Sequence, residues 1–196
     1  MGLVILAYPE VAVAHHALGG KTPQSFLSGF ISGLAHPIIG IDHFAFVVAA
    51  GLLALLCGIW VPLAFVGCSV LGTAVHLQSL NLPVPELFIA GSVLIFGILL
   101  ALKQHPNPLV TTGLAAIAGL FHGYAYGESI VGAQLTALVA YLSGFTVIQL
   151  GIATLAYRVG KAVCQPQADQ PSLPLRFAGC VIGGMGVAFL SSALLG

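Results

Sequence analysis

Charged side chains are scarce in this 196-residue chain: Asp, Glu, Lys and Arg together make up 5% of it, and the formal net charge is zero. A soluble domain carries about 25% charged residues, so a soluble globular protein is excluded. The basic residues are too few to form the positively charged surface that nucleic-acid binding requires. The alternation of apolar and polar residues that a transmembrane barrel needs is missing as well.

Several chemical motifs are also missing. The cysteines show no Cys-x-x-Cys pair and no ligand-like spacing, so we interpret them as small, mostly buried hydrophobic residues. There is no nucleotide-binding motif, which leaves the membrane potential, a proton or cytoplasmic trapping as energy sources for any transport. The metalloprotease pattern His-Glu-x-x-His is absent too. The cysteines are Cys57, Cys68, Cys164 and Cys180.

Hydrophobic residues make up 59% of the chain, and glycine occurs 25 times. Apolar runs of about 20 residues, the length that crosses a bilayer core of roughly 30 Å, recur throughout. The sequence therefore predicts an all-α, polytopic helical membrane protein. We expect a signal-like leader and polar segment over 1–25, and one transmembrane helical bundle over 26–196. About six transmembrane helices are expected, after a short broken helix at the start.

The first apolar region, 26–58, would be roughly 50 Å long as one helix, too long for a single crossing. The residue before a proline avoids helical geometry. We therefore expect Pro37 to divide this region, with a short helix ending near His36 and a crossing beginning near Asp42. The later crossings are expected at about 60–80, 86–103, 109–126, 130–157 and 176–195.

The basic residues predict the orientation of the bundle. Lys103 lies at the third-to-fourth connection, and Arg158, Lys161 and Arg176 flank the fifth-to-sixth. Basic residues concentrate on the cytoplasmic side, so the first crossing should begin outside; Lys21 is the exception. The small-x-small run 12–14 would suit signal-peptide cleavage, but no basic residue precedes it, and both outcomes stay open.

The strongest candidate site is the run His36-Pro37-Ile38-Ile39-Gly40-Ile41-Asp42-His43. Ionisable groups inside a membrane are costly and are functional candidates by default. Imidazoles with carboxylates suit nickel, cobalt or zinc, whereas copper(I) prefers Cys and Met, and magnesium or calcium prefer oxygen alone. Two structural alternatives remain: Asp42 could bind free amides in a first helical turn, and His36 could be structural before Pro37.

The topology places further candidate ligands toward the same outer face, while His105 falls in a cytoplasmic turn. Each has a structural alternative. The Glu86 carboxylate could simply stabilise the start of a helix through the helix dipole, and His76 could be a hydrogen-bonded histidine of an apolar core. His122 could belong to a small-residue stripe that packs against a neighbouring helix. A short echo, Gly-Leu-x-His followed six residues later by an acidic residue, links the two halves and suggests one shared site. The candidate metal ligands are His15, His36, Asp42, His43, His76, Glu86, His122 and Glu128.

Three segments carry a resemblance to a known family: 36–43, 86–92 and 122–128. Their motifs and their order are similar to those of the HupE/UreJ family of nickel and cobalt permeases. That resemblance implies a multi-pass protein of a bacterial-type inner membrane, surrounded by lipid, whose histidines and carboxylates pass a divalent ion inward from the periplasmic side. This sequence departs from the family pattern at Tyr126, a position where family members often have a second histidine.

The protein is thus expected to be a permease and not an enzyme. Its expected substrate is a divalent transition metal, nickel or cobalt, and zinc remains an alternative. An intramembrane zinc-dependent hydrolase and a metal-binding sensor without transport remain the alternatives. The sequence leaves open whether the chain forms a homo-oligomer.

Overall fold

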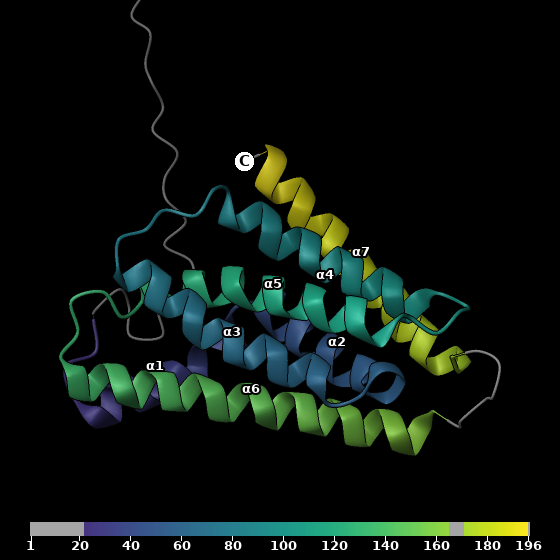
Figure 1. Cartoon of the computed structure of the whole chain (residues 1–196), viewed down its shortest axis with the longest axis horizontal. Helices are drawn as coiled ribbons and strands as arrows, with labels where there is room; N and C mark the ends of the chain where they lie inside the picture. Colours follow the sequence, from purple (N-terminus) through teal and green to yellow (C-terminus); the bar gives the residue numbers. More distant parts are fainter. Residues whose placement is uncertain (1–21, 165–170, 196) are drawn as a thin grey trace, which may run out of the picture.

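A computed structural model describes residues 22–164 and 171–195, and all regular structure among them is α-helix. The leader, including His15, lies outside the described residues. Short connections join the helices that follow one another in the chain, and several of the helices run roughly parallel to the long axis of the molecule (Figure 1). The helices are α1 (Phe26–Ile39), α2 (Ile41–Cys57), α3 (Trp60–Leu77), α4 (Pro85–Ala101), α5 (Pro108–Glu128), α6 (Leu135–Val163) and α7 (Leu173–Leu195).

The helix lengths confirm a polytopic membrane protein. α3, α5, α6 and α7 are each long and apolar enough to cross a bilayer, and α1 with α2 qualifies as one bent pair. α4 is apolar and has 17 residues, the short end of the range for a crossing. Four of the described helices, or five spans with the bent pair, are thus long and apolar enough to cross; the six expected crossings match α2 through α7 in position, but α2 and α4 fall short of that length on their own. Many large apolar side chains point outward, such as Trp60 (69% exposed) and Leu109 (83% exposed), as a lipid-facing surface requires.

The break in the first apolar region lies at Gly40, so the prediction that Pro37 divides it was wrong in position. Pro37 lies inside α1, and the Gly40 N–H still bonds the His36 carbonyl at 3.1 Å, which carries the helix on to Ile39. Gly40 then adopts an extended conformation (φ −71°, ψ 97°), and α2 leaves at 80° to α1. Pro37 lacks the N–H that would bond the carbonyl four residues earlier, and α1 ends two residues later at Ile39.

Glycine brings pairs of helices into backbone contact. A Cβ added at Gly119 or Gly123 of α5 would collide with the carbonyls of Phe65 and Ser69 of α3, so the expected small-residue stripe is confirmed as a packing face. α4 packs in the same way on α7, where a Cβ at Gly97 would meet the backbone of Gly183. α4 packs chiefly on α7, and α5 packs chiefly on α3.

The two ends of the bundle differ in charge. The connection after α4 and the C-terminal end of α6 carry exposed Lys103, Arg158 and Lys161, and these segments lie at one end (Figure 1). The α3–α4 and α5–α6 connections, with exposed Glu86 and Glu128 beside them, lie at the other end. We call the acidic end the outer end, following the predicted orientation.

Candidate functional site

His36 occupies the last turn of α1, next to the break, and is 5% exposed. Its Nδ1 lies 3.0 Å from the hydroxyl oxygens of both Ser129 and Tyr141. The Tyr141 hydroxyl donates its proton to the Tyr126 carbonyl at 2.9 Å, so it accepts a hydrogen bond from His36. A neutral His36 ring therefore carries its proton on Nδ1 and its lone pair on Nε2.

His43 is the third residue of α2 and is 3% exposed. Its Nδ1 lies 2.7 Å from Nδ1 of His122, which comes from α5 and is fully buried. Gly40 makes room for this ring, because a Cβ there would lie 2.5 Å from the His43 Cδ2 atom. The break between α1 and α2 thus positions both His36 and His43.

Ser92 of α4 determines which nitrogen of each paired ring carries the proton. Its hydroxyl donates to the Ile89 carbonyl at 2.7 Å, so it accepts a hydrogen bond from His122 Nε2 at 3.0 Å. A neutral His122 then accepts at Nδ1, and His43 donates its Nδ1–H. Histidines that bind metals usually anchor one nitrogen through a hydrogen bond and coordinate with the other. His36 and His43 both have this arrangement, with Nε2 as the basic nitrogen.

Aromatic rings enclose the three histidines. The Tyr126 ring lies 4.9 Å from His36 and 4.7 Å from His43, measured between centroids. Phe46 lies 4.8 Å from His122 and also contacts Phe65 at 4.6 Å and Phe96 at 4.4 Å. These three phenylalanines are at most 1% exposed; Phe46 and Phe65 pack directly against His122, and Phe96 packs against Phe46. We call Phe46, Phe65 and Phe96 the phenylalanine plug.

The carboxylates are arranged differently from the histidines. Asp42 is half-buried, and its Oδ1 accepts the backbone N–H of His43 at 2.8 Å, as the structural alternative predicts for a first helical turn, although Gly40 is the capping residue. Glu86 and Glu128 are exposed at the outer end. Within the described part of the chain, no three His, Cys, Asp or Glu side chains form a ready-made metal site.

His76 lies in the last turn of α3, outside the three-histidine cluster. Its ring packs on Tyr124 at 4.5 Å, and Gly127 makes space for it. His105 is exposed in the α4–α5 connection, away from the cluster, as predicted. The structure therefore joins three of the candidate residues, His36, His43 and His122, whose rings lie 5.8 Å (His36 to His43) and 4.8 Å (His43 to His122) apart.

Sequence reasoning missed the hydroxyl partners of these histidines. Tyr141 belongs to a stripe with Phe145 and Gln149, spaced at four residues along α6 and fully buried. That spacing was the available signal, because residues four apart share one face of a helix. Nothing in the sequence paired Ser129 with His36, since the two are 93 residues apart.

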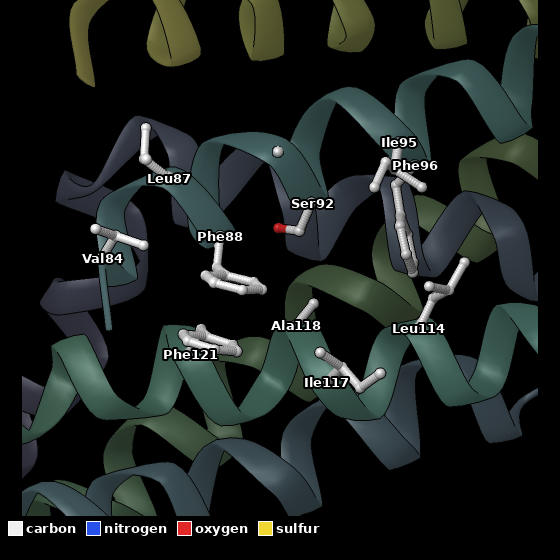
Figure 2. Close-up of a pocket in the computed structure, with 11 residues that line it drawn as sticks. Val84, Leu87, Phe88, Ser92, Ile95, Phe96, Leu114, Ile117, Ala118 and Phe121 are labelled. Carbon is white, nitrogen blue, oxygen red and sulfur yellow. The ribbon is translucent and has the colours of Figure 1, made fainter. Parts of the chain in front are cut away.

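An apolar cleft of about 480 Å³ opens between α4 and α5 (Figure 2). Phe88 and Phe121 stack across its outer part with centroids 4.0 Å apart. Ser92 lines the same cleft, and its hydroxyl also bonds His122. The side chain of Ser92 thus lies between the cleft and the histidine cluster.

Comparison with known proteins identifies the family. Residues 3–189 match the family described as HupE / UreJ protein. The chain is 34% identical over 170 residues to "Protein HupE" of Rhizobium leguminosarum bv. viciae, covering 82% of this chain and 84% of that protein. No solved structure matches. The chain, with its buried histidine cluster, therefore belongs to the HupE/UreJ family.

Proposed function

We propose that this protein is a permease that carries nickel or cobalt inward across a bacterial-type inner membrane. One observation carries the proposal: three helices bring three imidazoles together in an otherwise apolar interior. Polar groups in that environment are costly unless they serve a function. Imidazole nitrogen is a preferred ligand of nickel, cobalt and zinc, and the family comprises nickel and cobalt permeases.

The hydrogen bonds of the cluster support passage of an ion over permanent binding. His43 and His122 bond each other at 2.7 Å, so a metal that enters between them must separate the rings. A resident catalytic zinc is normally held by three protein ligands that converge on it. Among the residues that the structure describes, no three His, Cys, Asp or Glu side chains converge on one point in that way. A site that must rearrange to bind has a lower affinity, which allows the ion to leave.

The outer end supplies a route to this cluster. Glu86 and Glu128 are exposed there and attract cations by their charge. Asp42 is half-buried in the first turn of α2, and its Oδ1 accepts the backbone N–H of His43. The phenylalanine plug closes the inner side of His122. An ion would thus pass Asp42, reach the Nε2 atoms of His36 and His43, and wait there until the His43–His122 pair separates and the plug moves.

Uptake of nickel, cobalt and zinc into proteoliposomes tests the proposal, with metal binding measured on the same samples. His43→Ala and His122→Ala should abolish flux. Asp42→Asn should lower it sharply, because the amide oxygen still accepts the His43 N–H while the charge is lost. His105→Ala is the matched control, since that histidine is exposed outside the cluster, and it should transport normally.

Two outcomes would overturn the proposal. Tight zinc binding with no flux of any metal would favour the intramembrane hydrolase or the sensor. Normal flux in both His43→Ala and His122→Ala would remove the histidine cluster from the route.

A further inference from the structure

Gln149, near the middle of α6, is fully buried, and neither its amide oxygen nor its amide nitrogen has a hydrogen-bond partner among the described residues. A buried amide that makes no hydrogen bond destabilises a fold. The penalty is larger inside a bilayer, where the surrounding hydrocarbon offers no replacement. Leucine would fill this position without the free-energy penalty of a buried polar group, so the amide needs a functional explanation.

A second unpartnered polar group lies beside it. The hydroxyl of Tyr126 is fully buried and also lacks a hydrogen-bond partner within the described protein. It is close to the Gln149 side chain, although no hydrogen bond of normal geometry joins the two. Long side chains in helices lean toward the N-terminus of their helix. Because α5 and α6 run in opposite directions, Tyr126 leans inward and Gln149 leans outward, toward each other.

This pair adjoins the histidine cluster on its inner side. Tyr141, Phe145 and Gln149 follow one face of α6, with Tyr141 bonded to His36 and Phe145 in contact with the Tyr126 ring at 5.3 Å. Gln149 lies two turns beyond Tyr141, or about 12 Å further from the outer end. The Tyr126 ring contacts His43, while its hydroxyl reaches toward Gln149.

We propose that the Gln149 amide oxygen and the Tyr126 hydroxyl oxygen form a second binding position for the transported divalent cation, which receives the ion from His43. This inference rests on the proposed function. Both oxygens are neutral and suit nickel and cobalt less well than imidazole does. The ion would therefore be held weakly and released inward, together with some of its water. The partners of these polar atoms are the passing ion and its water. Because those are present only during transport, the atoms have no partner between transport cycles.

The competing explanation is purely structural, with a permanent water bonded to both groups. The two explanations differ in what Gln149→Leu does. Replacing a polar group that bonds a passing ion costs transport and leaves the fold as stable as before, or more stable. Removing a permanently hydrated group whose partner stays behind lowers stability and leaves the transport rate of the folded fraction unchanged.

The experiment measures initial nickel and cobalt uptake, equilibrium nickel binding and the thermal unfolding midpoint for Gln149→Leu, Gln149→Glu and Tyr126→Phe. Gln78→Leu and Tyr157→Phe are the controls, since both residues lie away from the cluster. We expect Gln149→Leu and Tyr126→Phe to slow uptake about tenfold or more, as loss of a supporting metal contact does, with binding and stability retained. Gln149→Glu should bind nickel more tightly and still transport it, because it keeps an oxygen ligand.

The outcomes separate this inference from the proposed function. No uptake by the unaltered protein, or normal uptake by His43→Ala, defeats the proposed function. Uptake that requires His43 but is unchanged in folded Gln149→Leu and Tyr126→Phe defeats only the second position. A lower unfolding midpoint for Gln149→Leu with normal uptake per folded protein assigns the pair to structural hydration and overturns the inference.

Discussion

Replacing Gly40 with alanine tests whether the position of the His43 ring determines transport. Gly40 has φ −71°, which alanine adopts without strain, so the change acts through the added Cβ and not through the backbone. That Cβ would lie 2.5 Å from Cδ2 and 3.3 Å from Cγ of the His43 ring. Carbon atoms pack at about 3.5 Å or more, so the ring must move by about 1 Å.

This displacement is large enough to break the contact between the two rings. The His43 and His122 Nδ1 atoms are 2.7 Å apart, and about 1 Å more exceeds the range of a hydrogen bond. The same movement displaces the His43 Nε2 atom that is proposed to hold the ion. Because a misplacement of about 1 Å in a functional group can cost up to about 100-fold in rate, we expect nickel uptake by Gly40→Ala to fall about tenfold or more.

Initial uptake rates in proteoliposomes, normalised to folded protein, measure the effect. Gly67→Ala and Gly113→Ala are matched controls, because a Cβ at either helical glycine meets nothing within 4 Å. Both should transport normally. Unaltered uptake by Gly40→Ala would show that the His43–His122 geometry is not required, and the reasoning would be refuted.

Three further predictions concern the plug, the protons and the outer carboxylates. Phe46→Ala should open the plug, so that manganese enters proteoliposomes faster with this variant than with the unaltered protein; equal manganese entry with both proteins would contradict this. Lowering the pH from about 7.5 to about 5.5 should reduce nickel uptake and nickel binding together, since protons occupy the imidazole lone pairs that bind the metal. Glu86→Gln with Glu128→Gln should slow uptake at low nickel concentration but not at saturation, and added salt should shrink the difference; a changed saturating rate would instead place these carboxylates in the route.

The helices were largely predictable because bilayer thickness fixes their length. The predicted run 60–80 became Trp60–Leu77, and 109–126 became Pro108–Glu128, so the errors were confined to the ends. The position of the first break was less predictable. A proline signals local disruption, but whether a helix ends there depends on the hydrogen bonds that remain, here that of Gly40 to His36.

The candidate site was predictable only in part. His36, His43 and His122 stood out because ionisable residues are rare in apolar runs, and the structure brings them together. Their hydroxyl partners did not stand out, since serine and tyrosine are ordinary in membrane helices. Glu86 and Glu128 were grouped with the histidines by the topology, by a short repeated motif and by the family resemblance, none of which fixes the distance of a side chain from the axis of the bundle.

The glycine contacts divide the bundle into parts of unequal stiffness. Backbones that touch, as α4 does with α7 and α5 does with α3, cannot slide without collision, so each pair behaves as one rigid body. Between those bodies lies the apolar cleft, where α4 and α5 are joined by the Ser92–His122 hydrogen bond. A rocking motion of one pair against the other would therefore strain that bond first and free His122 to turn, so that movement of the bundle and release of the ring become a single event.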